Sequence, residues 1–246
     1  MAKRSNWTVA EMFAETLIES DIKGKRTLIR FQDNTMTYEE IDRASNQLAH
    51  CLHTLGYGYG SVVPLMMNNC HEYMIVWLAL TKIGAITALV NTESSNMSLL
   101  HCLKTALVKS SGARPLSIIM GHEYRERFTP EIQSKLVKDF RDVAYYVFSK
   151  GDQERGNLNS LAAIHPATAL SPRLRSQVKI NDDVFIVYIN TSGTNGLPQA
   201  VRISHLDVII SGYIFKTLNG FKDYSQNWFK MIMDDDKKEL LNDIYQ

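Results

Sequence analysis

Residues 190–205 read NTSGTNGLPQAVRISH and combine the residue types of a phosphate-binding loop. Glycines let the backbone turn with positive φ and approach a ligand closely, and successive N–H groups in such a turn form a concave site for an anion. Hydroxyl side chains add donors for phosphate oxygens. The loop is not a Walker A motif, because GxxxxGKS/T is absent, and an ordinary polar turn between two strands is the more common outcome for this composition. The candidate residues are Thr191, Ser192, Gly193, Thr194 and Gly196.

Alternating strand and helix patterns supply a scaffold for this loop. Short apolar runs alternate with amphipathic runs of helical length, which is typical of βαβ units and a mostly parallel sheet with flanking helices. We therefore predict an α/β fold. The expected strands are residues 27–31, 62–67, 86–90, 115–120, 143–148, 183–189 and 199–204, and the expected helices are residues 9–20, 38–55, 70–84, 97–112, 130–140 and 206–218.

Capping sequences mark several helix ends. Thr8 with Glu11 and Thr37 with Glu40 form capping boxes, in which a hydroxyl and a carboxylate three residues apart satisfy N–H groups of the first turn. Gly56 is expected to end the second helix, because glycine adopts the left-handed conformation found there.

Three further sequence features are explained by helix ends and turns. Thr129-Pro130 predicts a helix start, because proline fits the first helical position. GYGYG, residues 56–60, resembles a dinucleotide fingerprint but lacks the GxGxxG spacing and follows a helix, so a helix end and turn are favoured. His205 lies near the loop and either begins the next helix or caps it; the cap is favoured.

The pattern divides the chain into four parts. Residues 7–148 carry the regular alternation and are expected to form a first α/β subdomain. Residues 149–182, rich in Gly, Asn, Ser, Pro and charge, are interpreted as a loop or linker. Residues 183–220 contain the candidate phosphate loop, and residues 221–246 are a divergent polar tail. The βαβ interpretation predicts that Ile41, Leu48, Trp77, Leu80 and Val187 are buried.

Composition and charge exclude several classes of protein. Lys and Arg number 27 against 26 Asp and Glu, a net charge of +1, which argues against nucleic-acid binding through a broad basic field. The three cysteines form no disulfide framework or CxxC pattern, and His50 with His53 lacks a third metal ligand at a suitable spacing. The apolar run 74–90 contains Lys82, so a buried helix and strand explain it better than a membrane span. Without a signal-peptide pattern, we expect an intracellular protein.

The sequence resembles the adenylate-forming superfamily. YINTSGTNGLPQA is similar to its signature Y-T-S-G-T-T-G-x-P-K, and Ser204-His205 downstream also fits. SNQLAHCLHTLGYGYGSVVPLMMNN, EYMIVWLALTKIGAITALVNT and SLLHCL follow in order and resemble the long-chain fatty acid transport proteins, which are also very-long-chain acyl-CoA synthetases. The resemblance extends from Trp7 to Gly220, with a poorer match over residues 113–180.

This resemblance implies the N-terminal subdomain of an adenylate-forming enzyme, with a second subdomain incomplete. Such enzymes activate a long-chain or very-long-chain fatty acid with ATP and Mg2+ to an acyl-adenylate and pass the acyl group to coenzyme A, leaving AMP. The resemblance also implies association with the endoplasmic reticulum or the plasma membrane, although no transmembrane segment is seen in this chain. It further implies that the protein can form a homo-oligomer. By position, Thr191, Ser192, Gly193, Thr194 and Gly196 cradle the β- and γ-phosphates.

Three loop positions depart from the family pattern. Asn190 replaces a tyrosine, Asn195 a threonine and Gln199 a lysine. Lysine would bring a positive charge to a polyphosphate, whereas glutamine offers a neutral amide; Asn195 and Gln199 are still expected to line the nucleotide site. After Phe221 the family's adenine-binding strand, magnesium-binding glutamate and C-terminal catalytic lysine are not found. We therefore assign no catalytic residue and expect a truncated relative of the fatty acid–CoA ligases that is inactive alone.

Two other hypotheses remain. One is a non-catalytic isoform that binds a full-length partner or a lipid surface, and the other is a gene fragment without a stable product. Transcript sequencing separates them from the enzyme hypothesis, because a reading frame that continues into the further motifs would favour an active enzyme.

Overall fold

The computed structural model describes residues 8–18, 25–31, 33–110, 116–140, 142–148, 158–163, 165–166, 168, 185–191 and 197–218. Its helices are α1 (Val9–Ile18), α2 (Tyr38–Thr54), α3 (His71–Lys82), α4 (Asn96–Lys109), α5 (Pro130–Asp139), α6 (Leu158–Ala163) and α8 (His205–Leu218), with a 3-10 helix η1 (His122–Arg127). Its strands are β1 (Thr27–Phe31), β2 (Asn34–Thr37), β3 (Val62–Met66), β4 (Ile86–Leu89), β5 (Leu116–Gly121), β6 (Val143–Phe148), β7 (Phe185–Thr191) and β8 (Gln199–Ser204).

The main sheet has six strands in the order β6-β5-β3-β4-β7-β8. β3 pairs in parallel with β4 and β5, and parallel pairing continues to β6 on one side and to β7 on the other. β8 pairs antiparallel with β7. Parallel neighbours need crossover connections, which α3, α4 and α5 provide for β3 to β6. The mostly parallel α/β fold predicted from the sequence is confirmed.

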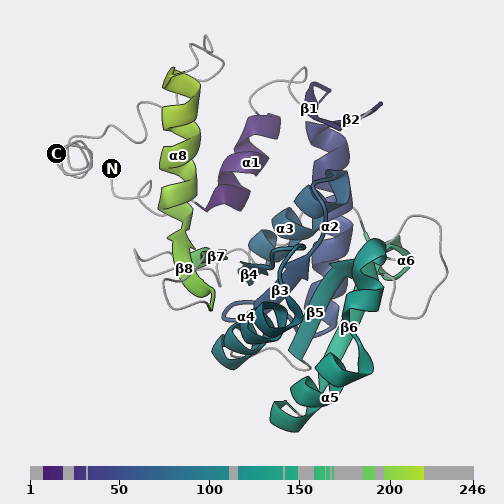
Figure 1. Ribbon diagram of the computed structural model, residues 1–246. Coiled ribbons are helices and arrows are strands. Elements are labelled where there is room, and N and C mark those ends of the chain that lie inside the picture. Colours follow the sequence, from purple (N-terminus) through teal and green to yellow (C-terminus); the bar gives the residue numbers. More distant parts are fainter. Residues whose placement is uncertain are drawn as a thin grey trace.

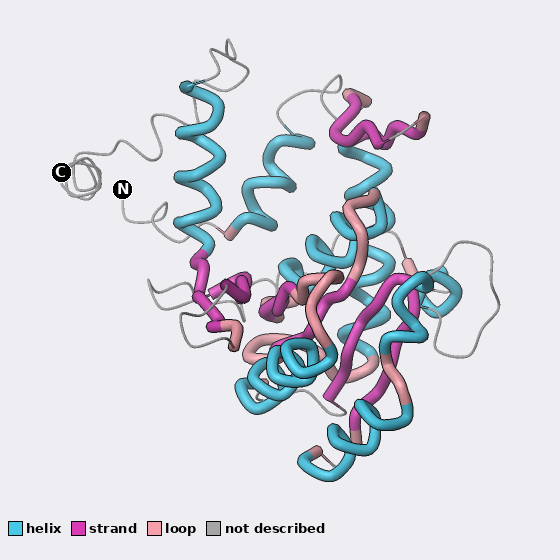
Figure 2. The backbone as a smooth tube through the Cα atoms, viewed as in Figure 1, coloured by secondary structure: helices cyan, strands magenta, loops and turns pink. Residues whose placement is uncertain are grey.

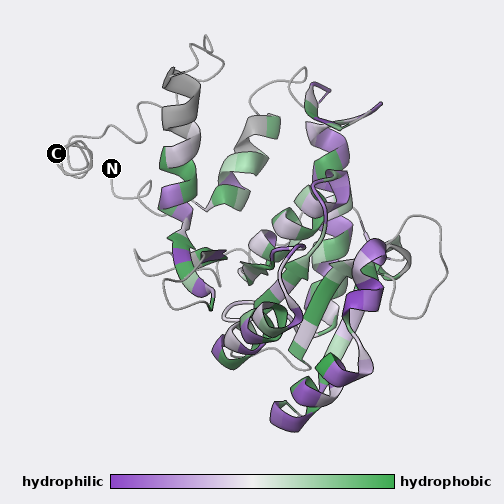
Figure 3. Cartoon of the chain, viewed as in Figure 1, coloured by the Kyte–Doolittle hydropathy of each residue, from purple (hydrophilic) through white to green (hydrophobic). Residues whose placement is uncertain are grey.

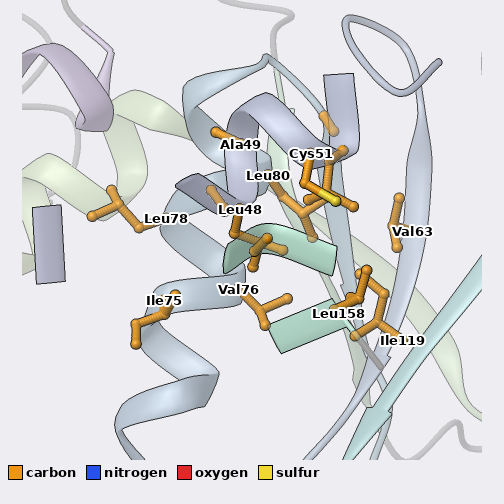
Figure 4. Packing of buried hydrophobic residues seen from close by; sticks show 14 of the residues in the cluster. Leu48, Ala49, Cys51, Val63, Ile75, Val76, Leu78, Leu80, Ile119 and Leu158 are labelled. Atoms are coloured by element: carbon orange, nitrogen blue, oxygen red, sulfur yellow. The ribbon is translucent and has the colours of Figure 1, made fainter. Parts of the chain in front are cut away.

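Helices cover both faces of this sheet, with α2 and α3 on one face and α4 and α5 on the other (Figure 1). Successive side chains of a strand point to opposite faces. Val63 and Leu65 of β3 therefore pack in the cluster with α2 and α3, whereas Met66 packs in the cluster with α4 and α5. Figure 4 shows the first cluster, where Leu48 of α2 and Val76 of α3 meet the strands. β5 is mostly hydrophobic, whereas α5 is largely hydrophilic (Figure 3).

Both predicted capping boxes are present. The Glu40 N–H donates to Thr37 Oγ1 at 3.2 Å, and the Thr37 N–H donates to Glu40 Oε2 at 2.8 Å. Thr8 and Glu11 repeat the arrangement at 2.9 and 2.8 Å. Gly56 follows α2 with a φ of 92°, a conformation that glycine adopts without steric strain because it has no Cβ. The predicted helix start at Thr129-Pro130 and the turn at residues 56–60 are likewise confirmed.

A small antiparallel hairpin, β1–β2, lies outside the main sheet near the start of α2 (Figure 2). The sequence predicts β1, but it does not predict β2. β2 is only four residues long and includes the N-cap residue of α2. So short a strand carries too little alternation to be recognised.

Two helices differ from the expectation. α4 ends at Lys109 rather than at Gly112, because Ser110 already has an extended backbone with a ψ of 121°. α6 lies within the stretch expected to be a loop or linker. Leu158 and Ala162, four residues apart, occupy one face of α6 and pack against the α2–α3 cluster. A six-residue helix is too short to show a helical period in the sequence.

The predicted core is confirmed at four of its five residues. Ile41, Leu48, Leu80 and Val187 are at most 5% exposed. Trp77 was predicted to be buried, but its side chain is only half-buried, because it lines a cavity described below.

A buried lysine connects α3 to α2. Lys82 Nζ lies 2.7 Å from Asp42 Oδ1, 2.7 Å from Ser45 Oγ and 2.8 Å from Asn46 Oδ1. The ring of Phe13 in α1 lies 5.8 Å from the same ammonium group. Because the Lys82 side chain is only 7% exposed, these partners replace the water that its charge would otherwise attract.

The apolar run 74–90 forms most of α3 and all of β4, as predicted. Within the described ranges, no helix has the length and apolar character to cross a membrane.

Candidate functional site

The candidate phosphate loop connects β7 to β8. Thr191 ends β7, Gln199 begins β8, and these two residues are paired across the strands. The antiparallel pairing therefore brings the two ends of the loop together at the carboxyl end of β7. This is the edge of the sheet at which open α/β folds bind ligands. Ser192, Gly193, Thr194, Asn195 and Gly196 lie outside the described residues, so their role in phosphate binding stays a prediction.

Two side chains fix the ends of the loop. Asn190 Nδ2 donates to the Leu89 carbonyl of β4 at 2.8 Å. His101 Nε2, on α4, lies 3.1 Å from the Pro198 carbonyl; a carbonyl only accepts, so Nε2 carries the proton in this contact. The asparagine that departs from the family pattern thus has a structural role. Sequence reasoning missed His101, because nothing in the sequence relates residues this far apart.

Gln199 lies at the start of β8 with an exposed side chain. It lies directly after the loop, and its expected role in lining the nucleotide site stays a prediction. A lysine at the same place could extend its charge along the loop.

His205 is the first residue of α8 rather than its cap, which corrects the favoured expectation. Ser204 is the cap: its Oγ accepts from the Asp207 N–H at 3.1 Å, and its own N–H donates to Asp207 Oδ2 at 2.7 Å. The His205 ring is 3% exposed, and Nδ1 accepts a hydrogen bond from the Val9 N–H of α1 at 3.1 Å. Burial lowers the pKa of His205 to about 4, so the ring is neutral at pH 7 and can accept this bond.

A cavity of about 470 Å³ lies beside the loop strands. Its walls come from α3, from Leu89 at the end of β4, and from β7, β8 and α8; Arg30 and Asn69 add polar groups. The volume falls in the range of small-molecule pockets, which are typically apolar with a few polar groups.

Possible metal ligands do not converge in the described part of the chain, where no group of three or more His, Cys, Asp or Glu residues could hold an ion. His50 Nε2 instead contacts the Thr168 carbonyl at 3.2 Å, and His53 is exposed.

Residues 20–235 match the family model described as AMP-binding enzyme. The chain belongs to the AMP-binding enzyme family. The match includes the scaffold strands β1 to β8 together with the loop between β7 and β8.

Among curated proteins, the chain is similar to long-chain fatty acid transport protein 2 of Rattus norvegicus, with 32% identity over 201 residues. The alignment covers 80% of this chain and 30% of that protein. The chain therefore spans less than a third of the length of this relative.

Solved structures of AMP-binding enzymes share the fold. The anthranilate CoA ligase AuaEII in complex with anthranoyl-AMP matches with a TM-score of 0.70 and 19% identity, over 86% of this chain and 37% of that chain. The N-terminal domain of FACL13 from Mycobacterium tuberculosis matches with a TM-score of 0.59 and 20% identity, over 80% of this chain and 44% of that chain. The α/β architecture is thus that of an N-terminal subdomain of an adenylate-forming enzyme.

Proposed function

We propose that the β7–β8 loop binds the phosphates of ATP, in a protein that belongs to the activation of long-chain or very-long-chain fatty acids. The observation that carries this proposal is the family match over residues 20–235, which spans both the loop and the scaffold that presents it. The similarity to a long-chain fatty acid transport protein supports the substrate class.

In the proposed reaction, the fatty-acid carboxylate attacks the α-phosphorus of ATP, an acyl-adenylate forms and pyrophosphate leaves. Coenzyme A then takes the acyl group and AMP is released. This chain would contribute positioning: the loop N–H groups and hydroxyls hold the β- and γ-phosphates while the strands fix their orientation. The described residues offer no acidic cluster for Mg2+, so no step here is assigned to that ion.

Gln199→Lys is expected to strengthen ATP binding about tenfold at low ionic strength, which corresponds to about 1.4 kcal/mol. The added ammonium group would lie next to a polyphosphate, where charge-assisted contacts are strong. Because salt screens an exposed charge, the gain should shrink at high salt. Titration calorimetry with ATP at two salt concentrations measures both effects.

Val137→Lys is the matched control. Val137 is 53% exposed on α5, and α5 lies far from β8 in the molecule (Figure 1). The Val137→Lys substitution therefore adds the same charge away from the loop. Equal ATP affinities for Gln199→Lys, Val137→Lys and the unaltered chain at low salt would contradict the placement of phosphate beside residue 199.

The 246-residue chain alone is expected to form no acyl-CoA. Acyl transfer of this kind needs an ordered ATP, a positioned carboxylate and a closing element that excludes water, and the chain spans 30% of its transport-protein relative. Incubation with a long-chain fatty acid, ATP, Mg2+ and coenzyme A should yield neither pyrophosphate nor thioester above the blank. Thioester that disappears in the Ser192→Ala and Gly193→Ala variants would contradict this expectation, because the 246-residue chain would then catalyse the reaction through its own loop.

A second candidate function is a non-catalytic relative that binds a full-length partner or a lipid surface. The neutral Gln199 at the lysine position favours it, because the loop would then hold phosphate too weakly for turnover. In that case neither the chain nor its Gln199→Lys variant would bind ATP, while both would fold.

A further inference from the structure

The cavity beside the loop strands has apolar walls. Its lining includes Met74 and Trp77 of α3 and Val187 and Ile189 of β7. The two β7 residues are two positions apart, so both side chains point to the same face of the sheet, whereas Tyr188 between them packs on the other face with α4. A space bounded in this way by a helix and a sheet favours a ligand with an apolar body.

The volume of the cavity, about 470 Å³, limits the size of such a ligand. A water molecule takes about 30 Å³ in the liquid and a methylene group fills a similar space, so the cavity holds roughly fifteen non-hydrogen atoms. An alkyl chain of about a dozen carbons with a small head group has this size.

Polar groups at the cavity are basic or neutral. Arg30 of β1 and Asn69, which precedes α3, are both part of the lining, and the Arg30 side chain is exposed. Within the described residues, no carboxylate forms an ion pair with the Arg30 guanidinium. An anionic head group at this position would therefore gain charge-assisted hydrogen bonds.

Two carboxylates lie close to the lining. Asp207 precedes the lining residue Val208, but it accepts hydrogen bonds from the Ser204 N–H and hydroxyl at 2.7 and 2.8 Å. Glu72 follows the lining residue Cys70; burial raises the pKa of the Cys70 thiol to about 11, and the Glu72 carboxylate contributes to the increase. This negative charge disfavours an anion beside Cys70, so the head group is expected at Arg30 instead.

We propose that the cavity binds a single-chain amphiphile with an anionic head, whose alkyl chain lies against Trp77 and Ile189 and whose head contacts Arg30. A free long-chain carboxylate and an alkyl phosphate share this chemistry, because guanidinium binds both in the same bidentate manner. The site goes beyond the proposed function, since binding here needs no ATP and changes no bond.

Trp77 reports on this site directly. The chain has two other tryptophans, Trp7 and Trp228, so a Trp7→Phe, Trp228→Phe background leaves Trp77 as the sole indole. A dodecanoate with bromine on its terminal carbon quenches an indole that it contacts. Without ATP and below the critical micelle concentration, we expect saturable quenching that plain dodecanoate reverses by competition.

Charge variants in this background test the head group. Arg30→Gln should weaken binding of dodecanoate and of dodecyl phosphate at least about tenfold, because it removes a charged hydrogen-bond donor. Arg43→Gln is the matched control, since Arg43 is exposed on α2 and is not among the described lining residues. Glu72→Gln should not weaken binding. Dodecyltrimethylammonium should bind far more weakly than either anion, and the tighter of the two anions identifies the source of the ligand.

Wall variants test the position of the alkyl chain. Ile189 and Val201 are paired across β7 and β8 and are 42% and 44% exposed, but of these two only Ile189 is among the described lining residues. Ile189→Asp should weaken dodecanoate binding at least about tenfold, because it places a like charge in an apolar wall. Val201→Asp should leave binding nearly unchanged. Circular dichroism verifies that every variant is folded.

Four results would overturn the proposal. Absence of quenching in the Trp77 background would show that the cavity takes no such ligand. Equal affinities for the background, Arg30→Gln and Ile189→Asp would show that the amphiphile binds elsewhere. Quenching only by vesicles of brominated phosphatidylglycerol would assign the cavity to a lipid surface. Competition that grows with protein concentration would assign it to a second copy of the chain. ATP binding is measured separately, so none of these results decides the role of the loop.

Discussion

Lys82→Met is expected to lower the free energy of unfolding by about 3 kcal/mol, because it removes one partner of a buried ion pair and strands the other. Asp42 would keep a charge at a carboxylate that is 21% exposed, and Asn46, which is 3% exposed, would lose the donor to its amide oxygen. Methionine retains most of the volume, so the loss measures the electrostatic network rather than a cavity. Urea unfolding followed by circular dichroism gives the value.

Lys135→Met is the matched control for this prediction. Lys135 and Glu131 on α5 form an ion pair with the same 2.7 Å distance, but their side chains are 50% and 73% exposed. An exposed pair of this kind is worth at most about 0.5 kcal/mol. Adding Asp42→Leu to Lys82→Met should recover stability to within about 1 kcal/mol of the unaltered chain, since an apolar pair can replace a buried ionic one. Equal losses for Lys82→Met and Lys135→Met would contradict the role of burial.

Acidification from pH 6.5 to pH 4 is expected to remove up to about 3 kcal/mol of stability through His205 alone. Burial lowers the pKa of this imidazole from 6.5 to about 4 in the folded chain, so the unfolded chain takes up the proton first. The contribution of His205 to the free energy of unfolding is therefore fully present above pH 6.5. It falls as the pH drops toward 4 and does not change further below that pH. Protonation of Nδ1 would also eliminate the acceptor of the Val9 N–H.

His205→Asn separates this contribution from that of the carboxylates. Asparagine offers an amide oxygen that can accept the Val9 N–H, but it does not titrate. Urea midpoints measured from pH 7 to pH 4 should fall less steeply for the variant. Parallel pH profiles for the two proteins would show that His205 is not the group responsible.

Helix positions were predictable because their ends carry local chemistry. The capping boxes at Thr8 and Thr37 act within four residues, so the sequence contains everything needed to recognise them. β2 and α6 were not predictable, because each is too short to show its own period. α6 in particular depends on Leu158 and Ala162 packing in the cluster formed with α2, which lies more than a hundred residues earlier.

The candidate site also has one part that the sequence predicts and another part that it does not. The loop and its flanking strands follow from residue types in one continuous stretch, so residues 190–205 could be identified at once. The contacts of His101 and His205 could not, because both reach distant parts of the chain. His205 was expected to cap α8, but Ser204 already fills that position and leaves the imidazole available to α1.

The hydrogen bond from Asn190 to Leu89 joins residues 101 positions apart, and it lies on the seam where β7 is added to β4. Bringing together residues so far apart has a large entropic cost, so this pairing forms slowly. The strands β3 to β6 are linked by much shorter crossovers. We therefore expect β3 to β6 to assemble first during synthesis and β7 to join late. In the interval β4 presents a free edge, which is the kind of strand on which chains aggregate. The candidate phosphate loop, held on that seam, would be among the last parts of the protein to form, and chaperone demand should rise with any change that weakens the β4–β7 pairing.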